Sequence, residues 1–229
     1  MLGFEIMSLP TAIVLARTLS CDPQTKPDVD IHIKSKPVLH DNSKTINELS
    51  QLFTGGQSVF DRQHATVAGL HQSKIPRQYE MNFKIASDGE QSCIHLTDVT
   101  VTIHHEATIY IAEEYLDDRC LYNTVLKHEL QHEKIDQQTI RSYKHDFYRA
   151  TSKFSKANKA FGPFPAEDLE NKKQELIEML GKSLEPVEKE WWTELRRRQA
   201  KIDTPKEYKR LSDKCRNKKS YQKRQERYE

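Results

Sequence analysis

Residues 120–136 read CLYNTVLKHELQHEKID, and the rest of the chain is interpreted around this stretch. Residues 128–132 read HELQH, which has the pattern H-E-x-x-H. No Pro or Gly occurs in residues 120–160, and apolar residues recur at spacings of three to five, which predicts a helix. On that helix His128 and His132 lie on one face, four residues apart. Two imidazole nitrogens placed in this way can bind one metal ion.

Zinc is the metal that this pair of ligands favours. Glu129 is rotated by about 100° around the helix from His128, so its carboxylate can act on a water molecule at the metal. The motif therefore predicts two zinc ligands, His128 and His132, and one general base, Glu129. The alternative interpretation is a solvated helix face, whose side chains pair with neighbouring lysines and bind no metal.

Two alternating runs rich in β-branched residues, 99–103 and 107–112, precede the motif and are predicted to be strands. Over roughly residues 93–136 the chain resembles zinc metallopeptidases of the zincin type, in which strands lead into a helix with H-E-x-x-H. More loosely, it is similar to small uncharacterised bacterial secreted proteins described as zinc proteases. In those proteins a Cys-x-Tyr-like segment leads into the motif, as Cys120 and Tyr122 do here.

The resemblance implies a hydrolase with Zn²⁺ as cofactor and a peptide or protein as substrate. Peptide bonds are then broken by a metal-activated water with Glu129 as the base, and an extended substrate is expected to add as a strand beside residues 99–112. The alternative is a helical interaction or adaptor protein without catalytic activity. In that case the motif is a structural metal site or a surface accident.

A catalytic zinc of this kind needs a third protein ligand. If the chain reverses near Gly162, Glu194 on the returning helix is level with the motif, and a Glu on a second helix is the third ligand in the gluzincin branch of the zincins. Asp203 and Tyr208 have a faint similarity to the ligand aspartate and the substrate-facing tyrosine of the aspzincin branch. The register of the two helices favours Glu194 over Asp203. Residues 104–106, His-His-Glu, are interpreted as a polar turn between the strands, with a second metal site as the alternative.

The predicted fold class is α+β, with a small mixed or antiparallel sheet, a long active-site helix and a C-terminal antiparallel helical hairpin. The predicted boundaries are residues 1–20 for a signal or an N-terminal apolar segment, 21–160 for a zincin-like catalytic domain, 161–205 for returning helices packed on the active-site helix and 206–229 for a basic, flexible tail.

The composition narrows the classes of function. The chain has 229 residues, 31% of them charged, and a formal net charge of +2. It contains no run of 18 apolar residues, so no transmembrane segment is predicted. The segment from Lys206 to Glu229 contains ten Lys and Arg residues and four Asp and Glu residues, so it is basic. That tail has no interleaved glycine and aromatic residues and no recognition module, so no nucleic-acid partner is expected.

The four cysteines have no C-x-x-C spacing. A hairpin of the two predicted strands would bring Cys93 close to Cys120, which leaves Cys21 to pair with Cys215. Disulfides indicate an oxidising compartment, so the predicted location is periplasmic or secreted. Reduced thiols in the cytoplasm are the alternative.

Overall fold

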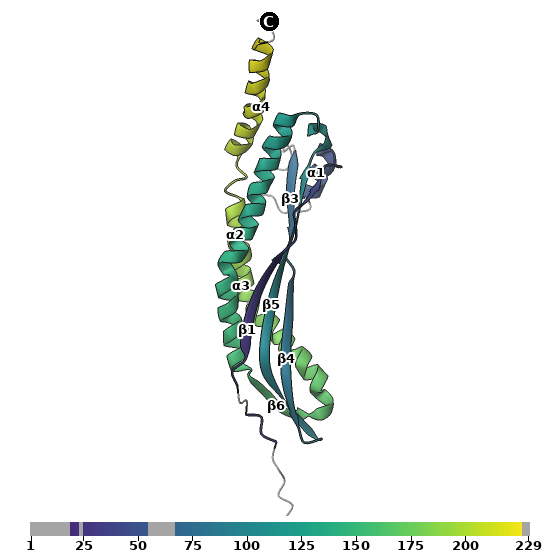
Figure 1. Ribbon diagram of the computed structural model, residues 1–229, viewed down its shortest axis with the longest axis vertical. Coiled ribbons are helices and arrows are strands. Elements are labelled where there is room, and N and C mark those ends of the chain that lie inside the picture. The colour runs from purple at the N-terminus through teal and green to yellow at the C-terminus, as the bar shows by residue number, and fades with distance from the viewer. Residues whose placement is uncertain (1–18, 23–24, 55–66, 226–229) are drawn as a thin grey trace, which may run out of the picture.

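One strand, β5 (Gln91–Ile111), runs the length of the sheet in this computed structural model, which describes residues 19–22, 25–54 and 67–225 (Figure 1). The strand contains no Pro or Gly, and every second residue from Val99 to Ile111 is buried, as the period of a strand requires. The two predicted strands 99–103 and 107–112 are therefore parts of one strand. The polar turn predicted at residues 104–106 does not form.

Every other strand hydrogen-bonds to β5, so the six-stranded sheet is three strands wide along its length. One flank of β5 pairs with two antiparallel strands, β4 (Arg77–Ser87) and then β3 (Gly69–Lys74). The other flank pairs in turn with antiparallel β6 (Ala160–Pro165) and with the parallel strands β1 (Asp28–Ser35) and β2 (Leu39–Asp41). Both flanks of β5 are therefore paired at residues 99–103 and 108–110, so the predicted addition of a peptide beside residues 99–112 is wrong there.

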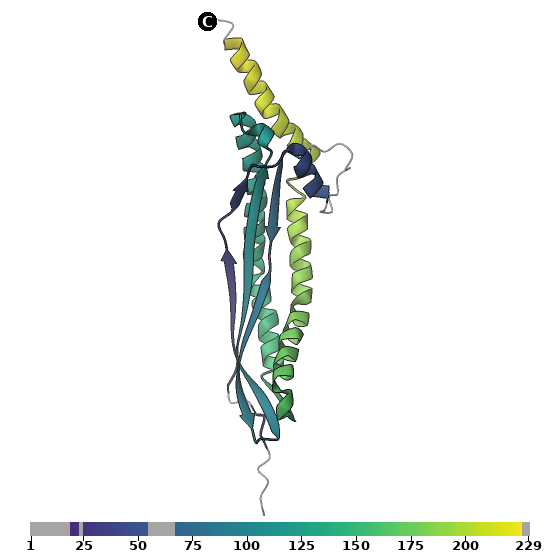
Figure 2. The ribbon, with the colours of Figure 1, turned by 90° about the vertical axis from the view of Figure 1, so that its right-hand side faces the viewer.

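Two long helices, α2 (Arg119–Ala157) and α3 (Leu169–Gln199), cover one face of the sheet (Figure 2). The carboxylate of Asp118 begins α2, because it accepts hydrogen bonds from the backbone amides of Cys120 and Leu121. The helix that contains the H-E-x-x-H motif is thus confirmed. The remaining helical elements are α1 (Ile46–Thr54), η1 (Glu113–Tyr115), η2 (Ala166–Asp168) and α4 (Pro205–Gln225).

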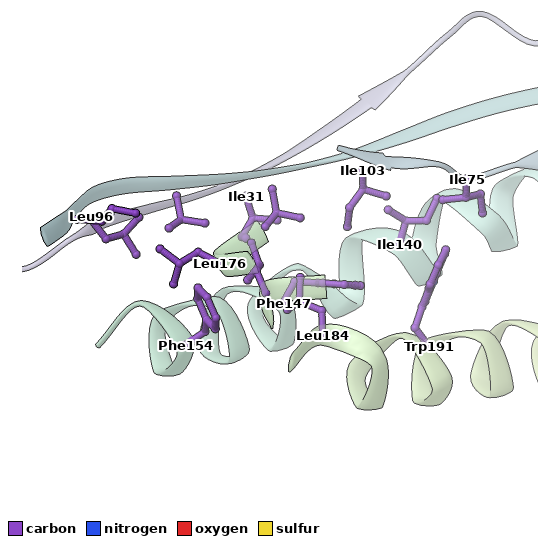
Figure 3. Close-up of a cluster of buried hydrophobic side chains, with 14 of the residues drawn as sticks. Ile31, Ile75, Leu96, Ile103, Ile140, Phe147, Phe154, Leu176, Leu184 and Trp191 are labelled. Carbon is purple, nitrogen blue, oxygen red and sulfur yellow. The ribbon is translucent and has the colours of Figure 1, made fainter. Parts of the chain in front are cut away.

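The hydrophobic core fills the space between the sheet and the two long helices (Figure 3). Side chains of β5 such as Ile103 meet Ile140 and Phe147 of α2, while α3 contributes Leu184 and Trp191. The rings of Phe147 and Trp191 pack edge to face, with their centroids 6.4 Å apart. This core fixes the position of α2 along β5. That position determines which residues lie opposite the polar side chains of α2.

The predicted fold class is wrong. Instead of a small sheet followed by a helical hairpin, the structure has six strands built on β5, and β6 lies between α2 and α3 in the chain. Strands and helices therefore alternate from β5 to α3, as they do in α/β proteins. The Gly162-Pro163 pair is a turn signal in sequence, but here Phe164 is buried in the core and this segment pairs with β5.

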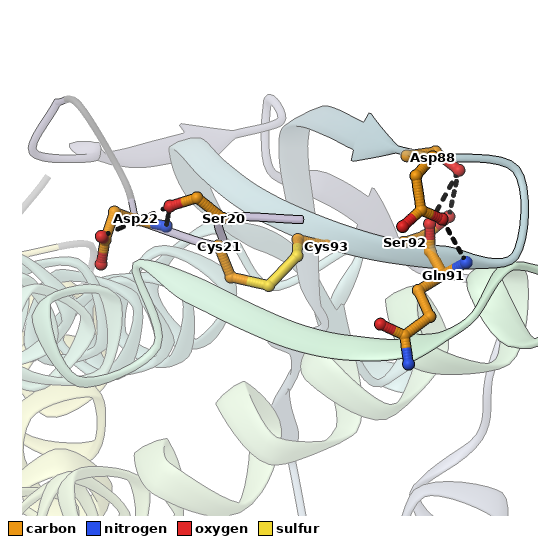
Figure 4. Close-up of a disulfide and its surroundings, with 8 residues drawn as sticks. Ser20, Cys21, Asp22, Asp88, Gln91, Ser92 and Cys93 are labelled. Carbon is orange, nitrogen blue, oxygen red and sulfur yellow. Dashed lines mark hydrogen bonds between the residues drawn. A yellow bond between two sulfur atoms is a disulfide. The ribbon is translucent and has the colours of Figure 1, made fainter. Parts of the chain in front are cut away.

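The predicted disulfide pairing is also wrong, because the structure pairs Cys21 with Cys93 (Figure 4) and Cys120 with Cys215. A strand rises about 3.3 Å per residue, so β5 carries the chain about 60 Å from Cys93 before it reaches Cys120. Cys215 lies in α4, which forms where residues 206–229 were predicted to be a flexible tail. Two disulfides are typical of proteins in oxidising compartments.

The predicted signal or apolar segment, residues 1–20, lies almost wholly outside the described residues. Among the helices that the structure does describe, none combines the length and the apolar content that a bilayer crossing needs.

Candidate metal centre

One face of α2 carries ionisable side chains that are buried. His128, Glu129, His132, Glu133 and Asp136 are each less than a tenth exposed. Their spacing along the helix repeats every three to four residues, which places them towards the same side. Because burying ionisable groups costs free energy unless they are paired or bind a metal, this face identifies the candidate site.

The first group of candidate ligands is formed by His128, His132 and Asp203. The two Nε2 atoms are 3.3 Å apart, and Asp203 Oδ1 lies 3.1 Å from His128 Nε2 and 3.0 Å from His132 Nε2. Ligand atoms around a tetrahedral zinc ion are about 3.3 Å from one another. The three atoms are therefore spaced like one face of a zinc coordination tetrahedron, and these residues fit the predicted metal.

Asp203 lies in the short connection between α3 and α4. Burial alone would raise the pKa of Asp203, but hydrogen bonds with His128 and His132 outweigh it and hold that pKa well below its usual range. Tyr208 donates a hydrogen bond to Asp203 Oδ1 over 2.9 Å, and its ring lies 5.7 Å from that of His128. Burial, together with the charge of Asp203, raises the pKa of Tyr208, so this hydroxyl remains a donor.

Gln199, which was not among the predicted site residues, fixes the orientation of His132. Its side-chain oxygen is hydrogen-bonded to His132 Nδ1, and its nitrogen donates to the backbone oxygen of His132 over 3.1 Å and to Asp136 Oδ1. Because an amide oxygen can only accept, His132 Nδ1 donates this hydrogen bond, so Nε2, which faces Asp203 Oδ1, is the nitrogen that a metal ion would bind in place of a proton. Partners of this kind orient histidine ligands in metal sites.

Glu129 is buried between α2 and β3, and this burial raises the pKa of its carboxyl to about 7. The backbone N–H of His71, on β3, donates a hydrogen bond to the Glu129 carboxylate. A proton acceptor works best when its pKa is near the working pH. The environment of Glu129 is therefore suited to moving a proton at neutral pH.

Gly69 allows β3 to pass directly over Glu129. A Cβ atom at this position would lie 2.4 Å from Val125 Cγ1 and 2.8 Å from Glu129 Oε1. Gly69→Ala is therefore expected to lower the free energy of unfolding by roughly 1–3 kcal/mol, the usual cost of overpacking, which a thermal or urea melt would measure.

Gly181→Ala is the matched control. Gly181 lies inside α3, and a Cβ atom there would meet only the side chain of Tyr79, at 3.7 Å. Its expected effect is stabilisation by up to about 1 kcal/mol, since Ala is a better helix former than Gly. Equal melting of the Gly69→Ala variant and the wild type would contradict the close approach of β3 to α2.

Glu194, the other candidate for the third ligand, lies outside this group. Its carboxylate accepts hydrogen bonds from Arg197 and Arg198, which lower the pKa of Glu194 to about 2. The reason is the register of the two helices: residues 160–168 form β6 and η2, so α3 begins later than a turn at Gly162 would allow. Gln199, and not Glu194, therefore faces His132.

Comparisons of the chain with protein-family models, with curated proteins and with solved structures found no match. The function is therefore argued from the site itself. A metal ion at the first group would lie next to a buried carboxylate, Glu129, and a phenol, Tyr208. That combination provides a Lewis acid, a proton acceptor and a hydrogen-bond donor, which is what hydrolysis of a carbonyl compound requires.

Proposed function

We propose that this protein is a zinc-dependent peptidase, with zinc held by His128, His132 and Asp203. The observation that carries this proposal is the convergence of two imidazole nitrogens and one carboxylate oxygen at separations of 3.0–3.3 Å. An aspartate ligand followed by a tyrosine is similar to the aspzincin branch of the zincins. The two disulfides support a location in an oxidising compartment, periplasmic or secreted.

Zinc, when bound, polarises a substrate carbonyl as a Lewis acid and lowers the pKa of a water molecule towards about 7. Glu129 accepts the proton of the attacking water and delivers it to the nitrogen of the leaving amine. Gln199 accepts a hydrogen bond from His132 Nδ1 and so keeps Nε2 as the nitrogen directed to the metal position. Tyr208 as a whole residue is 48% exposed, and its hydroxyl could donate to a substrate oxygen once it released its hydrogen bond to Asp203.

An extended peptide has a place to bind at β3. In the part of the chain that the structure describes, β3 pairs only with β5, so its other edge has no strand partner. Peptides add to such edges through backbone hydrogen bonds. Because β3 passes over Glu129 at Gly69, a peptide on that edge would run close to the proposed base.

The proposal is tested by the zinc content of the purified protein, measured by elemental mass spectrometry. His128→Ala/His132→Ala is expected to contain about one zinc ion fewer per chain than the wild type and to lose peptide hydrolysis, because two of three ligands are removed. His145→Ala, an exposed histidine on the same helix, is the control and should retain the wild-type zinc content. Equal zinc in the double variant and the wild type would refute the proposed site.

A further inference from the structure

A second group of buried ionisable side chains lies behind His132. It consists of His71 on β3, His105 on β5, and Glu133 and Asp136 on α2. The side-chain exposures of these four residues are 5%, 1%, 6% and 1%, in that order. The ring of His71 is stacked 6.1 Å from the ring of His132, with 12° between the ring planes. The ligand atoms of His71, Glu133 and Asp136 all lie within 4.8 Å of one another, and His105 lies beside the two carboxylates.

The four nitrogen–oxygen distances between the histidines and the carboxylates are 3.1–3.9 Å. His71 Nε2 lies 3.1 Å from Glu133 Oε2 and 3.9 Å from Asp136 Oδ2. His105 Nε2 lies 3.5 Å and 3.7 Å from the same two oxygens. Around a tetrahedral zinc ion these separations are about 3.3 Å, so both imidazole nitrogens face both oxygens at a spacing close to that of a shared metal.

An amide holds each carboxylate by the oxygen that faces away from the histidines. Glu133 Oε1 accepts a hydrogen bond from Gln137 Nε2 over 2.7 Å, and Asp136 Oδ1 accepts one from Gln199. The remaining oxygens, Glu133 Oε2 and Asp136 Oδ2, point to the histidines. Ligating carboxylates are oriented by hydrogen bonds of this kind, each presenting one oxygen to the ion.

His71 Nε2 and Glu133 Oε2 are hydrogen-bonded to each other, but other atoms of this group make no hydrogen bond. Asp136 Oδ2 and both ring nitrogens of His105 are buried, with no hydrogen-bond partner among the described residues. Native proteins rarely leave buried polar atoms in this state. A divalent cation bound between two neutral histidines and two ionised carboxylates would balance the charges of the carboxylates.

We propose that His71, His105, Glu133 and Asp136 bind a second divalent metal ion. Zinc suits two imidazoles and two carboxylates at tetrahedral spacing. All four positions are then filled by protein, as in a structural site, so this ion ties β3 and β5 to α2 and does not act on substrate. It shares no ligand with His128, His132 and Asp203, so the inference does not rest on the proposed peptidase activity.

The second ion would also support the first site. His71 offers its ring to this ion and its backbone N–H to Glu129, and Gln199 contacts both Asp136 and His132. Fixing His71 and Asp136 therefore fixes the partners of the proposed base and of one proposed zinc ligand.

The test is the number of zinc ions per chain, counted by native mass spectrometry after the protein is loaded with zinc chloride and passed into metal-free buffer. The wild type is expected to carry two ions, and Asp136→Asn, which is nearly isosteric, is expected to carry one. His128→Ala/His132→Ala should also carry one, and His145→Ala should keep both. In a thermal melt, EDTA should lower the Tm of His128→Ala/His132→Ala, which retains the structural ion.

The possible outcomes separate the two proposals. One ion in the wild type that is lost in His128→Ala/His132→Ala and kept in Asp136→Asn would overturn the second site and leave the first intact. One ion that is lost in Asp136→Asn and kept in the double variant would support the second site and refute the first. Glu133→Gln is a second variant should Asp136→Asn fail to fold. If neither variant folds, anomalous diffraction from zinc-loaded wild-type crystals, recorded at the zinc edge, is the deciding measurement. The proposal is overturned if no zinc signal lies among His71, His105, Glu133 and Asp136 and these residues form only ion pairs.

Discussion

Glu129→Gln is expected to reduce the rate of peptide hydrolysis by about 10²–10⁴-fold, the usual contribution of a general base, and to leave zinc bound. Glutamine has nearly the same shape and can still accept the hydrogen bond from the backbone N–H of His71. It cannot accept a proton from water. The measurement is the initial rate on a mixture of fluorogenic peptides, with the zinc content of the same samples determined in parallel.

The control for this variant is Glu190→Gln, which makes the same chemical change at an exposed position of α3. It is expected to leave both the rate and the zinc content unchanged. A Glu129→Gln variant that hydrolyses peptides as fast as the wild type would exclude Glu129 as the base. A wild type that shows no more hydrolysis than its EDTA-treated form would exclude the peptidase.

Asp203→Ala is expected to weaken binding of zinc at the first group by at least ~100-fold, since removing even an outer-shell partner of a ligand costs 10–100-fold. The two histidines remain, but the carboxylate oxygen that lies 3.1 Å and 3.0 Å from their Nε2 atoms is lost. Competition with a chromophoric chelator measures the affinity, and one of the binding events should disappear from the titration.

Glu194→Ala removes the rival candidate and serves as the comparison. Because its carboxylate is ion-paired with Arg197 and Arg198 on the same helix, zinc affinity should remain at the wild-type value. The opposite pattern, with zinc lost in Glu194→Ala and retained in Asp203→Ala, would show that α3 and the segment after it pack differently on α2.

The local part of the candidate site could be predicted from the sequence, because a helix fixes the relation of residues four apart. His128, Glu129 and His132 need only that helix, and the helix is present. The third ligand depends on where α3 begins. That start is set by the pairing of β6 with β5, and no short pattern in residues 160–165 distinguishes such a strand from a turn.

The sequence offered His105 only as part of an alternative second metal site at residues 104–106, although its place in the alternation of β5 could have singled it out. It falls in phase with Val101 and Ile103, which face the core, whereas His104 falls out of phase. A histidine at a core-facing position of a strand needs a partner. Dividing the strand at residues 104–106 removed this signal. The parallel pairing of β1 and β2 with β5 had no local signal, because the register of distant strands is decided by which faces can be buried together.

The arrangement of the sheet has a consequence for how the protein is made. Among the described strands, β1, β2, β3 and β4 are paired only with β5, and all four precede it in the chain. A ribosome therefore releases four strands before the one segment that can join them, and exposed strand edges are sites of aggregation. Until Ile111 has emerged, the nascent chain contains strands without a complete sheet, so its solubility during synthesis depends on how quickly β5 follows.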